Sequence, residues 1–272
     1  MQEFLNFFET MPIWMKAGWV FVTLAFFWLL EGYYSFFKLD YNKWKHAKTN
    51  MLLLAFVMII NALFGVVTVG VFGWLETTQF GLLHLFEAPV WVELLLAVLV
   101  LDFIAQYGVH FLLHKVPAFW RLHLVHHTDK HVDASTGTRH HPLDFILRES
   151  FALLAVVITG MPISFYFFYR ILSVAFTYFT HANLRLPVVL DKTLSYVIVT
   201  PNMHKFHHHF ELPWTDSNYG NMFSIWDHLF GTFVYGDMQH IQYGVDIAEY
   251  TDDENILTQL GMPFNKQVQS KK

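Results

Sequence analysis

The sequence contains no cysteine, and only 14% of its 272 residues are charged. Without cysteine the chain has no disulfide, no thiolate metal site and no cysteine nucleophile. The sparse charge and the net charge of −5 give no reason to expect a nucleic-acid partner. A basic segment before the first apolar stretch is missing too, because the first charged residues are Glu3 and Glu9. We therefore expect no cleavable signal peptide.

Apolar residues, in contrast, make up 54% of the chain, which favours an integral membrane protein. A helix needs about 20 apolar residues to cross the hydrocarbon core. Three segments reach this length: residues 12–37, 49–75 and 90–114. A further apolar segment is interrupted at Gly160-Met161-Pro162, so it predicts a helical hairpin with legs at about 145–160 and 163–184. This hairpin is either re-entrant or made of two further spans.

The basic residues predict how the spans are oriented. Lysines crowd the loop between the first two spans, whereas residues 76–89 contain neither Lys nor Arg. The positive-inside rule then places the first loop in the cytoplasm. The third span ends on the same side and the hairpin returns the chain to it. We therefore expect the region beyond residue 114 and the C-terminus to be cytoplasmic.

Histidine is strongly enriched, with 17 copies. The chain contains His110-x-x-x-His114 and two HxxHH motifs that begin at His123 and His204. Residues three and four apart share a helical face, so each HxxHH motif is predicted to present three imidazoles at one place. Imidazole binds iron, zinc, copper and nickel, and the set exceeds the needs of one ion but suits two. The predicted metal ligands are His110, His114, His123, His126, His127, His181, His204, His207 and His208.

The other histidines have weaker claims. His141, which precedes Pro142, is a further candidate ligand, and His209 is expected to point away from the face of its neighbours. Hydrogen-bonding or solvated roles are expected for the isolated ones: His46, His84, His228 and His240. Thr200 and Pro201 predict a helix start just before the last motif.

Carboxylates near the motifs are candidate partners of the histidines, because metal-bound imidazoles usually donate their second N–H to a carboxylate or carbonyl. Asp102 suits this role, since steps of four residues place it on one helical face with His110 and His114. A contact with a hydroxyl group of a neighbouring helix is the alternative for Asp102. The other candidates, which also suit a solvated loop, are Asp129, Asp133, Asp216 and Asn218.

At these residues the sequence resembles the fatty acid hydroxylase/sterol desaturase superfamily of integral membrane non-haem diiron proteins. The similarity extends from about Asp102 to Thr232. Besides the HxxxH motif it rests on residues 120–127, 139–142, 181–183, 203–208, 216–220 and 226–232. One departure is Phe111, where many members have Arg after the first histidine.

The resemblance implies a diiron centre that uses O₂ to hydroxylate or desaturate a C–H bond of a lipid, such as a sterol or a fatty acyl lipid. Zinc could replace iron in such an imidazole set. No flavin or nicotinamide fingerprint is visible, so electrons are expected from a separate reductase with a cytochrome or a ferredoxin.

The expected fold is a single all-α membrane domain over residues 1–272, with about three spans and the hairpin, capped by a cytoplasmic helical region that carries the histidines. Its parts are the N-terminal spans at 12–89, a catalytic region at 90–235 and a solvated polar tail at 250–272.

Two other functions stay open. A histidine-rich metal transporter would place its ionisable ligands near the middle of the spans, whereas these motifs lie at helix ends. A zinc-dependent membrane hydrolase would need a general base, and the HExxH motif is absent from the sequence.

Overall fold

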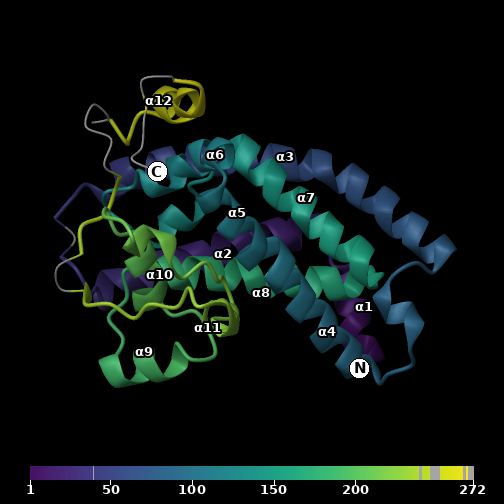
Figure 1. Cartoon of the computed structure of the whole chain (residues 1–272). Helices are drawn as coiled ribbons and strands as arrows, with labels where there is room; N and C mark the ends of the chain where they lie inside the picture. Colours follow the sequence, from purple (N-terminus) through teal and green to yellow (C-terminus); the bar gives the residue numbers. More distant parts are fainter. Residues whose placement is uncertain (39, 239–240, 246–251, 266–267, 269–272) are drawn as a thin grey trace.

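The computed structural model describes residues 1–38, 40–238, 241–245, 252–265 and 268, and every regular element within them is a helix (Figure 1). Pairing of β type is limited, in these residues, to three isolated bridges. The predicted all-α class is therefore confirmed for the described part of the chain. Three of its helical segments are long and apolar enough to cross a membrane.

The first two candidate spans are single helices. α2 covers Ile13–Tyr33 and α3 covers Lys43–Thr78. With 36 residues, α3 is about 54 Å long, which exceeds a hydrocarbon core of about 30 Å. Apolar side chains on α3 such as Val66 are exposed, which suits contact with lipid.

The third candidate span consists of three helical parts with different winding. α4 (Val90–Asp102) and α5 (Val109–Lys115) are joined by η2 (Phe103–Gly108), a stretch of π-helix. A π-helix closes its hydrogen bonds over five residues instead of four, so it rotates α5 about the axis relative to α4. Asp102 ends α4 and His110 lies in α5, so about two helical turns separate the two residues along the span.

The predicted hairpin is formed by α7 (Pro142–Thr159) and α8 (Ile163–His181). Gly160 separates them, and its φ of +69° is the left-handed conformation that ends many helices. η1 (Leu82–Leu85) lies against this turn. The break that the sequence indicated at residues 160–162 is therefore the turn of the hairpin.

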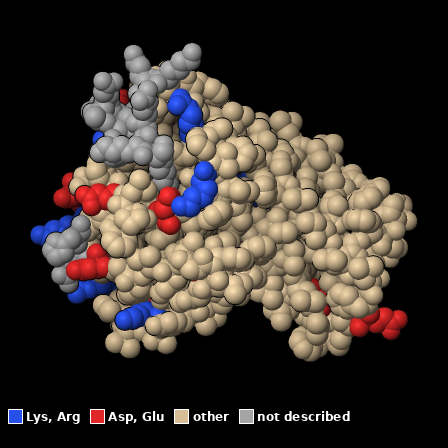
Figure 2. Space-filling model, viewed as in Figure 1, with Lys and Arg blue, Asp and Glu red and all other residues tan. Residues whose placement is uncertain are grey.

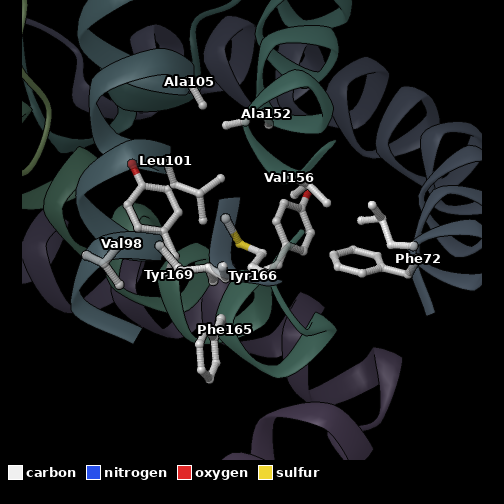
Figure 3. Close-up of a cluster of buried hydrophobic side chains, with 14 of the residues drawn as sticks. Phe72, Val98, Leu101, Ala105, Ala152, Val156, Phe165, Tyr166 and Tyr169 are labelled. Atoms are coloured by element: carbon white, nitrogen blue, oxygen red, sulfur yellow. The ribbon is translucent and has the colours of Figure 1, made fainter. Parts of the chain in front are cut away.

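The main hydrophobic core lies where α3, α4, α7 and α8 meet (Figure 3). Leu101 of α4, Val156 of α7 and Tyr169 of α8 are almost completely buried in it. α1 (Gln2–Thr10), which the sequence analysis did not predict, covers α8 through ring contacts of Phe8 with Phe168 at 5.2 Å. This core fixes the hairpin against the third candidate span.

The remaining helices are short and lie mostly beside one end of the long ones, at the left of Figure 1. They are α6 (Pro117–His127), η3 (Ala134–Thr138), α9 (Val188–Leu194), α10 (Pro201–His207), η4 (Trp214–Asp216), α11 (Ile225–Phe230), α12 (Ile256–Gly261) and η6 (Met262–Phe264). Figure 2 shows that most charged side chains of this face gather at the same end. Apolar long helices and a charged short-helix region are thus separated in space.

The prediction of a solvated tail at 250–272 is wrong for residues 252–265 and 268, which are the part of that segment that the structure describes. Met262 is 2% exposed and packs in a small core with Trp120 and Leu124 of α6. Nε of Arg121 donates a hydrogen bond of 2.7 Å to the carbonyl oxygen of Pro263. The few apolar residues of this polar segment are therefore enough to anchor it on α6.

Replacing Gly160 by alanine is expected to destabilise the fold. A β-carbon there would collide with the carbonyl oxygen of Phe80, and a non-glycine residue in this conformation costs about 1–2 kcal/mol by itself. Thermal unfolding in detergent should show a clearly lower midpoint for Gly160→Ala. Gly73→Ala, inside α3 where no atom lies near the added carbon, is the control and should unfold at or above the parent temperature. Equal midpoints for the two variants would contradict the role of Gly160.

Candidate metal centre

Nine buried histidines converge where α5, α6, α8 and α10 meet. They are the nine that the sequence motifs singled out, and they form two groups. Within each group, one ring nitrogen per residue lies within 4.8 Å of all the others. Group one is His110, His114, His123, His127 and His207. Group two is His126, His181, His204 and His208.

Each HxxHH motif is divided between the two groups, which corrects the prediction of three imidazoles at one place. Successive residues of an α-helix point about 100° apart. His127 therefore joins His123 in group one, while its neighbour His126 turns toward group two. His207 and His208 are divided in the same way. One motif thus contributes to both groups and holds them next to each other.

Backbone carbonyls orient two imidazoles of group one. Nδ1 of His110 lies 2.8 Å from the carbonyl oxygen of Tyr219, and Nδ1 of His207 lies 2.6 Å from that of Ser217. A carbonyl oxygen only accepts hydrogen bonds, so the proton of each neutral ring is on Nδ1. The lone pair of Nε2 then points away from the backbone toward the other histidines.

Group two is oriented by the same kind of contact. Nδ1 of His181 donates to the carbonyl oxygen of Thr177 at 2.7 Å, and Nδ1 of His126 donates to that of Arg139 at 3.2 Å. The Nε2 atoms of His126 and His181 then face each other at 3.2 Å with no proton between them. Two lone pairs repel at this distance, and a cation between them removes the repulsion.

The spacing of the ring nitrogens fits metal coordination. Metal–imidazole bonds of about 2.0–2.1 Å place two nitrogens at right angles on one ion about 3.0 Å apart. The Nε2 atoms of His110 and His123 are 3.0 Å apart, and so are those of His181 and His204. In group two, His208 is buried with no hydrogen bond to either ring nitrogen. A bound cation would relieve the cost of that desolvated nitrogen.

Burial also keeps these rings in the form that binds metal. Desolvation lowers the pKa of His123 to about 4, and it lowers the pKa of His126, His204 and His208 well below the ordinary value. The rings are therefore neutral at physiological pH, and a neutral imidazole has the lone pair that a metal requires.

Two carboxylates contact histidines of group one. Oδ1 of Asp216 lies 3.3 Å from Nδ1 of His114, as the sequence analysis anticipated. Asp144 was missed: its Oδ2 lies 3.2 Å from Nδ1 of His123 and 3.0 Å from Nδ1 of His140. The four-residue spacing of His140 and Asp144 at the start of α7 is the signal that could have indicated this pair.

Asp102 does not have the predicted contact with a ligand histidine. Its carboxylate accepts hydrogen bonds from the hydroxyl of Tyr169 at 3.1 Å, from Nε1 of Trp226 at 2.9 Å and from the backbone N–H of Phe223 at 3.2 Å. The alternative considered above, a hydroxyl of a neighbouring helix, is the one observed. The reason is that Asp102 lies about two helical turns before His110, where the groups within reach belong to α8 and to the segment of Phe223 and Trp226.

The other predicted polar partners stabilise loops around the site. Asp129 is buried with Oδ2 3.4 Å from Nε2 of His46, and Asp133 caps η3. Asn218 donates a hydrogen bond of 2.9 Å to the carbonyl oxygen of Met203 in α10. The charge of Asp129 also acts on His181 and His208 of group two.

The histidines with weaker claims lie outside both groups. His141 caps α7, and Nδ1 of His141 and of His209 each accept a hydrogen bond from the backbone N–H two residues later. His84 and His228 approach backbone carbonyl oxygens at 3.1 and 3.3 Å. His240 lies outside the described residues.

Fold and site together define a helical membrane protein with a histidine-lined metal centre. Residues 94–232 match the model of the fatty acid hydroxylase family, and this region is slightly more than half of the chain. The chain belongs to the fatty acid hydroxylase family, so the resemblance noted from the histidine motifs is confirmed.

Curated relatives carry related names. The chain is 26% identical over 145 residues to the ornithine lipid hydroxylase OlsE of Rhizobium tropici, a match that covers 53% of this chain and 43% of that protein. It is 33% identical over 133 residues to an alkylglycerol monooxygenase of Caenorhabditis elegans, with 48% and 25% covered. The human alkylglycerol monooxygenase is 26% identical over 151 residues, with 55% and 32% covered. The matches thus span less than half of each relative's length. No solved structure matches significantly.

Proposed function

We propose that this chain hydroxylates a C–H bond of a membrane lipid with O₂ at a centre of two iron ions. The observation that carries the proposal is the pair of buried histidine groups, in each of which one ring nitrogen per residue lies within 4.8 Å of all the others. The names of the relatives, a lipid hydroxylase and monooxygenases, support hydroxylation over desaturation. In the balanced reaction the C–H bond, O₂, two electrons and two protons give an alcohol and water.

The protein residues would act by holding and tuning the centre. Bound iron would supply the activation of O₂ that a C–H bond requires. The carbonyl groups of Tyr219 and Ser217 fix two rings of group one. Asp144 and Asp216 accept N–H bonds from His123 and His114, which raises the basicity of a ligand. Zinc would fit the same donors without supporting the reaction, because it does not change oxidation state.

The proposed partners follow from the reaction. The substrate is an amphiphilic lipid that reaches the centre from the bilayer. The electrons come from a separate reductase with a cytochrome or a ferredoxin. We place the histidine groups and the C-terminus on the cytoplasmic side because Lys43, Lys45 and Lys48 begin α3 at the same end. The catalytic region is proposed to be residues 90–235, close to the family match at 94–232.

The two alternatives are less well supported. A transporter needs ligands along its spans, whereas His114 is next to the last residue of α5 and His181 is the last residue of α8. A zinc hydrolase needs a general base beside the metal, and the HExxH motif that supplies one is absent from the sequence.

Lipid profiling with isotopically labelled O₂ tests the proposal. Membranes of cells that express the parent chain should contain a lipid with one labelled oxygen atom that the host alone lacks. His207→Ala should abolish this product, because His207 belongs to group one. His209→Ala is the matched control, since His209 lies outside both groups and should leave the product unchanged.

Two outcomes would overturn the assignment. A product two hydrogens lighter and without label would show desaturation instead of hydroxylation. An unchanged lipid profile together with metal transport across the membrane would favour the transporter.

A further inference from the structure

In α9 the acidic residue is buried and the apolar residues are exposed, which is the opposite of the pattern in a helix that faces water. Asp191 is completely buried, and its Oδ1 accepts hydrogen bonds from the hydroxyl groups of Thr200 at 2.8 Å and Tyr235 at 2.9 Å. Val188 and Val189 of the same helix are 63% and 79% exposed. A water-facing helix would bury the valines and expose the carboxylate.

α11 repeats this reversal. Asp227 is completely buried and accepts hydrogen bonds from the backbone N–H groups of Tyr219 at 2.7 Å and Gly220 at 2.9 Å. Leu229 and Phe230 are 69% and 53% exposed. In both helices the acidic side chain is buried and accepts internal hydrogen bonds, while apolar side chains are exposed on the surface.

The two exposed faces form one surface, because α9 and α11 touch through the segment that follows α9 (Figure 1). The ring of His228 in α11 stacks on Tyr196 at 5.4 Å, and its Nε2 lies 3.3 Å from the carbonyl oxygen of Ser195. We call this surface the α9–α11 patch. Its apolar members are Val188, Val189, Leu190, Val197, Leu229 and Phe230.

The patch continues onto the third candidate span. Phe230 stacks on Phe103 at 5.6 Å and on Tyr107 at 5.4 Å, and both belong to η2. At the other border Arg185 and Lys192 are exposed. An apolar surface that joins a span on one side and ends in basic residues on the other matches the boundary between hydrocarbon and lipid headgroups.

We propose that the α9–α11 patch is embedded in the membrane interface beside the third span. A lipid surface accounts for both the outward apolar side chains and their continuity with Phe103 and Tyr107. The patch lies close to the metal centre, because Asp227 holds the loop of Tyr219, whose carbonyl oxygen orients His110. Lipid would therefore contact a helix that supports group one. This inference concerns the placement of the chain and does not depend on the proposed reaction.

Spin labels can test this placement in the full chain, which has no cysteine of its own. Single cysteines at Val189 and Leu229 would carry a nitroxide label in vesicles of phosphatidylcholine and phosphatidylglycerol. Both labels should collide more with O₂, which concentrates in hydrocarbon, than with a water-soluble nickel chelate. Val66→Cys on α3 is the lipid-facing control, and Asp237→Cys, at an exposed loop position, is the water-facing control.

Two results would overturn the proposal. Collisions dominated by the nickel chelate at Val189→Cys and Leu229→Cys, as at Asp237→Cys, would show that the patch faces water. Weak collisions with both reagents together with dipolar broadening between labels would show that a second copy of the chain covers it. Unfolding midpoints equal to that of the parent establish that each labelled variant is folded.

Discussion

Alanine substitution at the adjacent residues His126 and His127 is expected to affect different metal ions. The parent should bind about two ions per chain, one at each histidine group. His126→Ala leaves three histidines in group two, so metal content should fall to about one ion per chain. His127→Ala leaves four in group one, so that ion should be retained but bound more weakly. His126→Ala should reduce lipid hydroxylation to background, because the proposed reaction needs both ions, whereas His127→Ala should reduce it less.

Elemental analysis of purified protein, before and after dialysis against a chelator, distinguishes the two variants. Dialysis should remove the remaining group-one ion from His127→Ala faster than from the parent. His209→Ala is the control for both, since it belongs to neither group, and it should match the parent in metal content and turnover. Full activity in a parent chain that carries a single ion would contradict the division into two sites.

Asparagine at Asp144 is expected to weaken metal binding, whereas asparagine at Asp102 is expected to leave it unchanged. Asp144 is buried and accepts N–H bonds from Nδ1 of His123 and His140. Losing the charge of such a partner typically costs about 10–100-fold in metal affinity or activity. Asp102 contacts no histidine among the described residues; its partners are Tyr169, Trp226 and Phe223.

Two measurements separate these roles. Metal affinity, determined by competition with a coloured chelator, should fall for Asp144→Asn and stay at the parent value for Asp102→Asn. The unfolding midpoint should fall for Asp102→Asn. The carboxylate now accepts three hydrogen bonds with two charged oxygens, whereas the amide has one neutral acceptor oxygen. Loss of affinity in Asp102→Asn with parent affinity in Asp144→Asn would reverse the assignment.

The hairpin and the metal ligands could be read from local sequence. The break at Gly160 and Pro162 lies at the turn between α7 and α8, because those residues end and start helices by their own backbone geometry. Thr200 likewise caps α10 as predicted. Eight of the nine histidines were identifiable because their spacing of three and four residues is a local property of a helix, whereas His181 stands alone at the end of the predicted hairpin.

Two predictions were wrong for the same reason: that Asp102 contacts a ligand histidine, and that the C-terminal segment is solvated. In both cases contacts between residues far apart in the chain decide where the side chains lie. Asp102 lies two steps of four before His110, about two helical turns away, and its contacts come instead from Tyr169, Phe223 and Trp226, which are far away in the sequence. The segment of Met262 was predicted to be solvated from its polar composition, yet its few apolar residues anchor it on α6.

The sequence by itself determined the membrane character, the helical class and most of the histidines that converge in the structure, because hydropathy and helical period depend only on neighbours along the chain. Only the tertiary structure decided which histidines share a group, that Asp144 reaches His123 across 21 positions, and that α9 turns Asp191 inward. Each of these depends on how one helix is rotated against another. That rotation is set by packing between residues far apart in the chain, which no local pattern encodes.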